Sequence, residues 1–458
     1  MSIGFRSARD FAGRIAALST IVLVVASVAP WTGASAYTLK TLYSFCAQAG
    51  CSDGEDPEST VVMDGSRHLF GTTPYGGLGD YDGTVFELTS DGHGNWTYTL
   101  LYSFCPKSGC KDGTFPQGGV IVDTAGNLYG MTEFGGREGS GTVYELSPNA
   151  RRTKWKLNIL YNFCSQDGCG SGNNLTQGPA SRLTYSGASS GALYDGVSPL
   201  YGTTLVGGDG GVGSIFQLTP VVGTDKWKFK VLRNLDFFVD GEDPSGLLID
   251  AAGNLYGTTL NGGTGAGTAF ELSPNARKTR WTQTVLHSFC TLSGCADGGY
   301  PAAGMIMDAS GTLFGTTGFG GASQHCPNAS GPGCGVVFKL APNGTASQET
   351  LLYTFCDAKH CPDGNYPAGD MTMDASGNLF GSTYRGGGNE IDHYGQGGGT
   401  VFELNGTVLN VLYRFCSQDN CADGEYPNGV IRDGSGNLYG TGLLGGANGG
   451  GSVFQLIP

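Results

Sequence analysis

Three of the six histidines fall in segments where imidazole and carboxylate side chains gather. His325 and His393 each lie in a long Gly-rich segment, and His360 lies between two cysteines in the stretch that separates those segments. Imidazole and carboxylate groups together can bind a transition metal, or act as general base and acid near neutral pH. The alternative is a pair of exposed loops with scattered polar residues. The candidate ligand-binding residues are His325, His360, His393, Asp357, Glu390, Asp392 and Tyr394.

The 14 cysteines follow a regular spacing. Twelve form six copies of Cys-x4-Cys, and the other two, Cys326 and Cys334, lie together in an insertion. A zinc site would need four converging ligands, whereas each copy offers two. We therefore expect disulfides, which are typical of an oxidising compartment. The expected pairs are Cys46–Cys51, Cys105–Cys110, Cys164–Cys169, Cys290–Cys295, Cys326–Cys334, Cys356–Cys361 and Cys416–Cys421.

A third set of groups with possible chemistry is a series of carboxylates in Asp-Gly-x-x-Pro. If all of them lie on one face of the molecule, they could form a ring that binds a cation. The other interpretation is that each Asp caps its own turn while the following Gly takes a positive φ. We favour the turn, because the spacing lacks the dense ligands of a calcium loop. These residues are Asp53, Asp112, Asp240, Asp297, Asp363 and Asp423.

Composition and missing motifs narrow the possible partners. A net charge of −14 argues against nucleic acid, whose phosphates need a basic surface, and against an anionic membrane. The sequence has no Gly-x-Ser-x-Gly, His-Glu-x-x-His or phosphate-cradling motif. We therefore assign no catalytic residue and no metal, and we expect no cofactor.

The elements that position these residues belong to an internal repeat. Its most regular part is Leu-Phe/Tyr-Gly, which recurs seven times between residues 69 and 440. The copies are Leu69-Phe70-Gly71, Leu128-Tyr129-Gly130, Leu200-Tyr201-Gly202, Leu255-Tyr256-Gly257, Leu313-Phe314-Gly315, Leu379-Phe380-Gly381 and Leu438-Tyr439-Gly440.

Four short strands are predicted in each copy. In the second copy they are Val120 to Asp123, Asn127 to Thr132, Thr142 to Leu146, and Lys156 to Phe163. Units of four strands fit the blades of a β-propeller. An open β-solenoid is the alternative, but it would need capping repeats, and neither end resembles a cap. We predict an all-β fold, a seven-bladed β-propeller.

The two ends of the repeat region support a closed ring. The region begins with a copy of the last strand type, Thr38 to Phe45, and ends with the third type, Ser452 to Leu456. The final unit therefore lacks its outer strand. We predict that Tyr37–Phe45 pairs with Gly451–Leu456 and closes the circle.

The repeat also carries a recognisable motif. Asp-x-x-Gly-Asn-Leu-Tyr-Gly-Thr-Thr, followed by Gly-Gly and Gly-Thr-Val-Phe-Glu-Leu, resembles the Gloeo/Verruco (GloVer) tandem-repeat family of exported bacterial proteins. The resemblance covers Tyr37 to Pro458. Members often carry a C-terminal sorting anchor that this chain lacks, which implies free secretion or periplasmic residence. The family brings no established reaction.

Propeller topology assigns the loops to two faces. The connection into the inner strand and the loop between the second and third strands share one face, and nearly all length variation lies there. Blade five extends this loop to Gly318–Gly335 and blade six to Gly386–Gly399. Because variable loops on a rigid scaffold usually carry binding, we predict the functional site at this corner.

The first 36 residues are predicted to direct export. Three arginines precede the apolar stretch Ile15 to Val28, and Ala34-Ser35-Ala36 supplies a cleavage site. We expect a signal peptide over residues 1–36 and one propeller domain over residues 37–458, without a membrane span after cleavage. We expect a secreted or periplasmic monomer that binds a carbohydrate or another extracellular small molecule or polysaccharide. The alternative is a polysaccharide-active hydrolase or lyase with its site at the corner of blades five and six.

Overall fold

The computed structural model describes residues 37–79, 82–106, 109–164, 181–326, 333–341, 348–388 and 396–458. By compactness the chain divides into residues 1–34 and residues 35–458, and the account below concerns the second unit. The predicted signal peptide lies outside the described residues. Within these ranges, no helix has the length and apolar character needed to cross a membrane.

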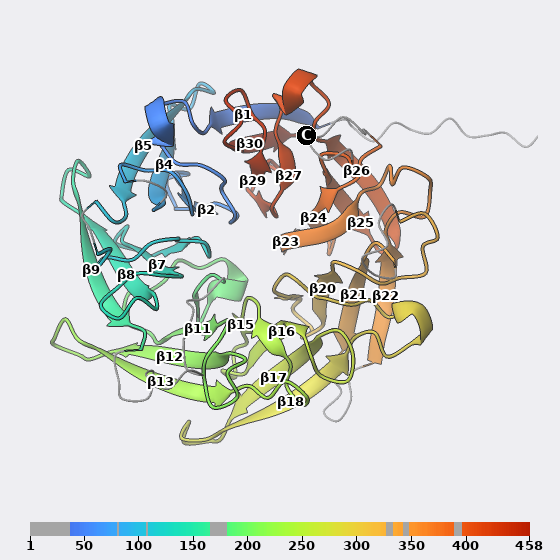
Figure 1. Cartoon of the computed structure of the whole chain (residues 1–458), viewed down its shortest axis with the longest axis horizontal. Coiled ribbons are helices and arrows are strands. Elements are labelled where there is room, and N and C mark those ends of the chain that lie inside the picture. Colours follow the sequence, from blue (N-terminus) through green and yellow to red (C-terminus); the bar gives the residue numbers. More distant parts are fainter. Residues whose placement is uncertain are drawn as a thin grey trace, which may run out of the picture. The chain divides into compact units, whose positions relative to one another are not determined.

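Seven antiparallel sheets of four strands form a ring, which confirms the seven-bladed β-propeller (Figure 1). In two blades the inner strand is split into two short pieces, so these sheets count five strands. Each blade runs from an inner strand at the axis to an outer strand at the rim. In blades one to six the strand order follows the sequence, as the repeat predicts, whereas the outer strand of blade seven is the first strand of the chain.

The strands of blades one to three are given from the axis outward. Blade one contains β2 (Val62–Met63), β3 (Leu69–Thr73), β4 (Thr84–Ser90) and β5 (Trp96–Ser103). Blade two contains β6 (Val120–Val122), β7 (Leu128–Thr132), β8 (Thr142–Pro148) and β9 (Trp155–Asn162). Blade three contains β10 (Thr184–Tyr185), β11 (Leu200–Thr204), β12 (Ser214–Pro220) and β13 (Trp227–Asn234).

Blades four to seven repeat this arrangement. Blade four contains β14 (Glu242–Pro244), β15 (Leu248–Ile249), β16 (Leu255–Asn261), β17 (Thr268–Pro274) and β18 (Trp281–Ser288). Blade five contains β19 (Ile306–Met307), β20 (Leu313–Thr317), β21 (Val336–Ala341) and β22 (Gln348–Thr354). Blade six contains β23 (Asn365–Met373), β24 (Leu379–Arg385), β25 (Thr400–Asn405) and β26 (Val408–Arg414). Blade seven contains β27 (Glu425–Pro427), β28 (Ile431–Arg432), β29 (Leu438–Leu444), β30 (Ser452–Ile457) and β1 (Thr38–Ser44).

The ring closes as predicted. Strand β1 pairs antiparallel with β30, from Thr38 opposite Ile457 to Ser44 opposite Ser452. Figure 1 shows the N-terminal strand, in blue, as the outermost strand of the last, red blade. The closing blade therefore contains strands from both ends of the chain.

The Leu-Phe/Tyr-Gly motif is explained by packing within each blade. Its Gly lies on the second strand, directly under the aromatic residue of the third strand. A methyl group at Gly202 would lie 2.6 Å from the ring of Phe216, which is fully buried. The motif therefore needs Gly for close approach, and the Leu and aromatic residues of the motif extend the apolar layers between blades.

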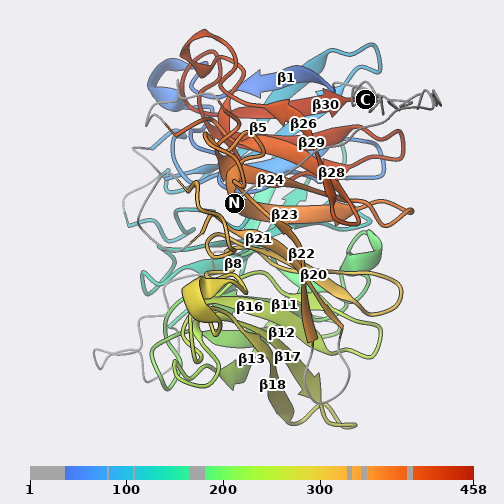
Figure 2. The same ribbon diagram turned by 90° about the vertical axis from the view of Figure 1, so that its right-hand side faces the viewer.

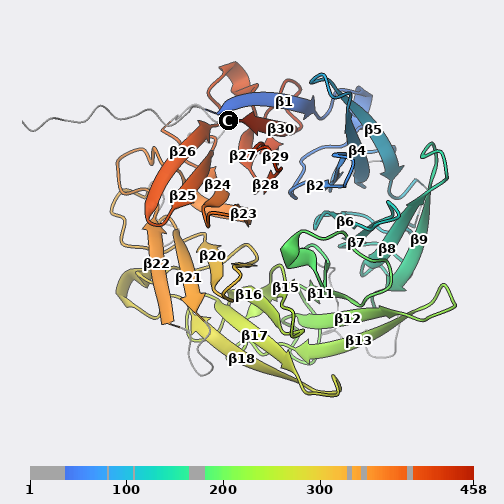
Figure 3. The ribbon, with the colours of Figure 1, turned by 180° about the vertical axis from the view of Figure 1, so that it is seen from behind.

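Loops separate onto two faces, as Figures 2 and 3 show. One face bears the short helices η1 (Ala49–Cys51), η3 (Ser293–Cys295) and η4 (Asp419–Cys421), each of which ends at the second cysteine of a Cys-x4-Cys pair. We call this the disulfide face. The opposite face carries η2 (Ala188–Ser190), part of an elongated turn in blade three that the sequence pattern did not indicate.

Candidate functional site

The disulfide face is built from two loops per blade that are joined by backbone hydrogen bonds. The carbonyl of the second cysteine accepts from a Gly of its own Asp-Gly turn and from a Gly of the loop between the second and third strands. At Cys51 the donors are Gly54 N, at 2.8 Å, and Gly77 N, at 3.0 Å. The same pattern recurs at Cys295, Cys361 and Cys421. Each disulfide loop therefore supports the variable loop beside it.

The carboxylates of Asp-Gly-x-x-Pro cap their own loops. Asp53 accepts hydrogen bonds from Ala47 N at 3.0 Å, from Gln48 N at 3.1 Å and from the Tyr43 hydroxyl at 2.7 Å. Asp240, in the blade without cysteines, accepts from Arg233 instead of a tyrosine, with Arg233 Nη2 at 2.6 Å. All six accept a backbone N–H from the preceding loop. The turn interpretation is therefore confirmed for all six carboxylates.

The aspartates of the opposite face have the same role. Each accepts the backbone N–H of the residue four positions later, as Asp123 does from Asn127 N at 2.8 Å. The set comprises Asp64, Asp123, Asp250, Asp308, Asp374 and Asp433. The carboxylate that appears in nearly every repeat is thus structural on both faces.

The cysteine pairs are formed as expected within the described residues. Six pairs are bonded and no described cysteine is free. The seventh expected pair, Cys164–Cys169, cannot be followed because Cys169 lies outside the described residues.

The predicted corner of blades five and six is partly described. His325 lies beside the disulfide loop that carries Asp357 and His360, with its carbonyl oxygen 3.4 Å from Cys356 Sγ. Asp357 and His360 are exposed. A shallow hollow of about 360 Å³ lies next to His325 and is lined by Ser293, Gly294, Ala296, Gly321, Ala322, Ser323, Gln324 and Gly333.

The other four predicted residues, Glu390, Asp392, His393 and Tyr394, lie outside the described residues. Within the described ranges, four groups of Cys, Asp and Glu side chains lie close enough together to share a metal ion. None of these groups contains a histidine. A shared site of the three imidazoles therefore stays a prediction.

A feature that sequence reasoning missed is an arc of aromatic rings on the disulfide face of blades five to seven. Successive ring centroids are 5.5, 5.1, 6.1 and 4.7 Å apart. All but the last ring are half-buried, so they are partly open to solvent. We call this set the aromatic arc, and its members are Tyr300, Phe319, Tyr366, Tyr384 and Tyr426.

Backbone geometry holds the aromatic arc in place. Tyr300, Tyr366 and Tyr426 are each the fourth residue of Asp-Gly-x-x-Pro and have φ between 54° and 57°. Their backbone N–H groups donate to carbonyls of the preceding blade, at 2.7, 2.9 and 2.8 Å. Phe319 and Tyr384 come at the start of the long loops of blades five and six. An aromatic residue before the Pro of this motif was the signal in the sequence.

Blades one and two carry a shorter version of the arc, in which Tyr75, Phe115 and Phe134 contact in sequence at 4.6 and 5.8 Å. Between the two arcs, blade one has Asp56 at the position before the Pro, where blades two, five, six and seven have an aromatic ring and blade four has Asp243. Burial, together with the charges of Glu55 and Glu58, raises the pKa of Asp56 to about 7.

The axis of the ring is crossed by Arg182 from blade three. Its Nη2 donates to the carbonyl of Thr60 in blade one at 2.6 Å, and its Nη1 lies 3.7 Å from Asp370 Oδ2 in blade six. These contacts bring the inner edges of three non-adjacent blades within reach of one side chain.

Comparison with known proteins agrees with the repeat. The family model described as the Gloeobacter/Verrucomicrobia repeat matches residues 27–197 and 180–326, more than half of the chain. No curated protein matches the sequence.

Many solved structures resemble the chain. A streptogramin B lyase is 10% identical, with 92% of this chain and 97% of that chain covered and a TM-score of 0.49. An ulvan lyase is 12% identical, with 88% and 94% covered and a TM-score of 0.47. A carbohydrate-active enzyme of Trichoderma reesei is 11% identical, with 92% and 96% covered and a TM-score of 0.41. At these identities, the similarity says nothing of a shared ligand.

Proposed function

The chain belongs to the Gloeobacter/Verrucomicrobia repeat family, and from this premise we propose that it is an exported binding protein for a carbohydrate. The observation that supports the proposal is the aromatic arc on the disulfide face. Bonded cysteine pairs also support residence outside the cytoplasm, where disulfides persist.

The geometry of the aromatic arc suits a sugar chain. The C–H bonds on one face of a sugar ring form an apolar patch, which packs against the electron-rich face of an aromatic ring. Three of the four ring contacts are edge-to-face, at 65° to 80°, so successive rings of the arc turn their faces in different directions. A run of such rings favours an extended chain of sugars over a single monosaccharide.

Polar groups around the aromatic arc would fix the orientation of a bound sugar, which contact with apolar rings alone does not. The guanidinium of Arg385 lies 5.7 Å from the centroid of the Tyr384 ring. The long loops that begin beside Phe319 and Tyr384 carry His325 and the predicted residues Glu390, Asp392, His393 and Tyr394. We propose that these loop residues form the rim of the site together with His360 and Asp357, which lie in the disulfide loop between the two long loops.

The carboxyl group of Asp56, between the two arcs, favours a second candidate function, a polysaccharide hydrolase or lyase. A carboxylic acid whose pKa is raised to about 7 is half protonated near neutral pH and can donate a proton to a leaving oxygen. Burial and the charge of Glu58 also raise the pKa of Glu133 nearby. Cleavage would therefore use Asp56 in blade one, and not the corner of blades five and six.

A glycan array and a polysaccharide panel test the binding proposal. For a glycan that binds the parent protein, Tyr384→Ala or Phe319→Ala is expected to weaken binding about fivefold, since an aromatic contact is worth roughly 1 kcal/mol. Phe238→Ala is the matched control, because Phe238 lies in the cysteine-free loop, outside the aromatic arc, and is 77% exposed. Equal losses in all three variants, or no glycan bound by the parent, would contradict the proposal.

The enzyme candidate has its own readout. Release of new sugar ends from a bound polysaccharide should be lost in Asp56→Asn while binding to the aromatic arc is retained. If no polysaccharide that binds is shortened by the parent protein, the hydrolase or lyase is excluded and the binding function stands.

A further inference from the structure

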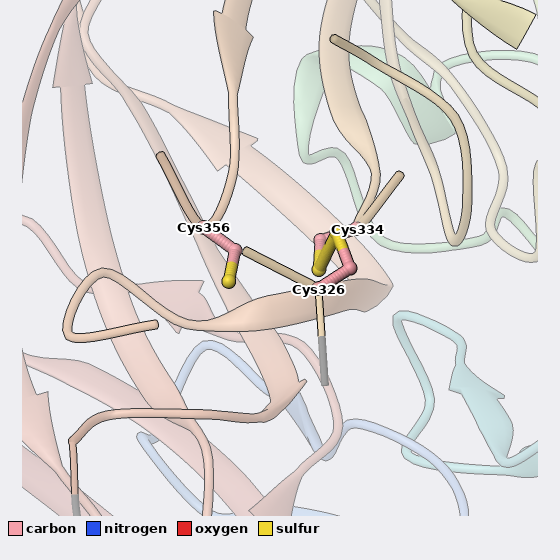
Figure 4. Close-up of side chains that lie close together, drawn as sticks. All are labelled: Cys326, Cys334 and Cys356. Atoms are coloured by element: carbon pink, nitrogen blue, oxygen red, sulfur yellow. A yellow bond between two sulfur atoms is a disulfide. The ribbon is translucent and has the colours of Figure 1, made fainter. Parts of the chain in front are cut away.

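Four cysteines from two neighbouring loops meet at the corner of blades five and six. Cys326 and Cys334 join the ends of the blade-five insertion, and Cys356 and Cys361 form the disulfide loop that leads into blade six. The sulfurs of Cys326, Cys334 and Cys356 all lie within 4.8 Å of one another (Figure 4), and Cys361 is bonded to Cys356.

Contacts other than the disulfides hold the two loops together. Ser323 Oγ donates a hydrogen bond to the carbonyl of Cys356, and the backbone N–H of Tyr366 donates to the carbonyl of Cys334 at 2.9 Å. Cys334, Cys356 and Cys361 are at most 5% exposed and belong to the apolar core between the blades. These hydrogen bonds hold the backbone at Cys334 and Cys356 in place independently of the S–S bonds.

The other described cysteine pairs offer a different chemistry. The nearest ligating group to Cys46 and Cys51 is the carboxylate of Glu55, and the pair Cys416 and Cys421 has Glu425. Among the described residues, the corner of blades five and six alone brings two pairs together. The repeat supplies two cysteine sulfurs per copy, here those of Cys356 and Cys361. The insertion in blade five supplies two more, those of Cys326 and Cys334.

We propose that this corner is a redox-controlled metal site, with two disulfides in the oxidised protein and a tetrathiolate Zn²⁺ site in the reduced protein. Zinc holds four sulfurs at about 2.3 Å, which places them about 3.8 Å apart at the corners of a tetrahedron. Three of the four sulfurs already lie within 4.8 Å of one another, and the fourth, that of Cys361, is bonded to one of these three. Thiolate ligands favour Zn²⁺ over Mg²⁺ or Ca²⁺.

The reaction balances with a phosphine as reductant. Two phosphines and two water molecules reduce the two disulfides, giving four protein thiols and two phosphine oxides. One Zn²⁺ then replaces the four thiol protons, which leave to solvent. Because the metal binds the thiolate form alone, bound zinc opposes reoxidation by mass action.

Cobalt(II) is a suitable probe, because four thiolates around it give strong visible absorption and a sulfur-to-cobalt charge-transfer band. The full chain is reduced with a phosphine, checked for its β-sheet circular dichroism, and titrated with Co²⁺ in the absence of oxygen. We expect one Co²⁺ per chain with the tetrathiolate spectrum, displaced by one equivalent of Zn²⁺. The oxidised chain should give no such spectrum.

Two matched variants locate the site. Cys326→Ser with Cys334→Ser should abolish the tetrathiolate spectrum, whereas Cys416→Ser with Cys421→Ser, which removes another pair of the repeat, should leave it intact. Absence of Co²⁺ binding to the folded reduced chain, or an unchanged spectrum in the first variant, would overturn the proposal. If reduction unfolds the chain, Zn²⁺ is expected to restore the β-sheet circular dichroism of the reduced parent but not that of the reduced first variant. Equal recovery in both proteins, or recovery in neither, would also overturn the proposal.

Discussion

At the scale of single residues, the polar groups that recur in nearly every blade serve the fold. Asp53 and its counterparts accept hydrogen bonds within their own loops, which leaves little capacity for a ligand. Residues that differ between blades are therefore the informative ones. Asp56 replaces an aromatic ring in blade one, and blades four and five replace an aromatic contact at the rim by a half-buried ionisable pair.

That pair is His287 of blade four and Glu349 of blade five, with His287 Nε2 3.4 Å from Glu349 Oε2. Equivalent positions elsewhere hold stacked rings, such as Tyr43 and Tyr98 at 4.1 Å. Burial, with the charge of Asp297, raises the pKa of Glu349 to about 8. Burial lowers the pKa of His287, although Asp297 acts against this. The raised pKa of Glu349 and the lowered pKa of His287 both favour the uncharged forms of the two side chains in the folded protein at neutral pH.

This pair predicts a pH dependence of stability. The pKa of Glu349 is 4.5 in the unfolded chain and about 8 in the folded protein. Between these two pH values the folded protein keeps the Glu349 proton while the unfolded chain releases it. The free energy of unfolding should therefore fall as the pH rises through this range. Glu349→Gln, which resembles the protonated form, should remove the part of this fall that Glu349 causes and be the more stable protein above pH 8, by at most about 5 kcal/mol. Denaturant unfolding at pH 5 and above pH 8 measures the difference.

Glu138→Gln is the matched control, because Glu138 is exposed in a loop of blade two. Its stability should follow that of the parent protein at both pH values. If the parent and Glu349→Gln curves run parallel between pH 5 and 8, Glu349 does not hold its proton in the folded state.

At the scale of elements, each blade is fastened to the next by a contact between two motifs. The Pro of Asp-Gly-x-x-Pro packs against the last Gly before the third strand of the preceding blade. A methyl group at Gly399 would lie 2.7 Å from Pro427 Cδ and would also meet the carbonyl oxygen of Thr383. The two motifs therefore form one junction between blades six and seven, although they lie in different repeats.

Substitution at this junction should be costly. Gly399 and Gly377 have φ of 91° and 84°, so alanine at either position meets the same backbone strain of about 1–2 kcal/mol. A methyl group at Gly377 contacts nothing within 4 Å, whereas at Gly399 overpacking adds roughly 1–3 kcal/mol. Chemical unfolding should therefore rank the parent first, Gly377→Ala next and Gly399→Ala last. Equal stability of the two variants would show that the junction accommodates the methyl group.

At the scale of the whole molecule, closure depends on the pairing of the chain's first strand with its last. Without β1, strand β30 would present an open edge with unpaired N–H and C=O groups, which invites association between molecules. Because Thr38 lies opposite Ile457, a short hairpin could connect the end of the chain directly to β1.

Two rearranged chains test closure. Deletion of residues 37–45 should lower the free energy of unfolding and cause self-association, visible in size-exclusion chromatography. Moving the same residues to follow Pro458 through a short turn should restore both the stability and the monomeric elution of the parent. A deletion variant that stays monomeric and as stable as the parent would show that β1 is dispensable.

The sequence by itself determined what depends on local pattern. Alternation within Thr142 to Leu146 predicts a strand, seven copies of Leu-Phe/Tyr-Gly predict seven blades, and the mismatch between the two ends predicts how the ring closes. The short Cys-x4-Cys spacing likewise predicts which cysteines pair, because a loop of that length brings few other partners within reach. All of these follow from residues that are neighbours in the chain or copies of one another.

The tertiary structure decided what depends on contact between different blades. Phe319 and Tyr366 lie 5.1 Å apart in the aromatic arc, Cys326 lies beside Cys356, and His287 faces Glu349, yet no repeat contains both members of any of these pairs. Their approach depends on the curvature of the ring and on where an insertion folds back. Local hydrogen bonding and hydrophobic periodicity carry no information about either, and so the surface that we propose for binding became visible only when the blades were assembled.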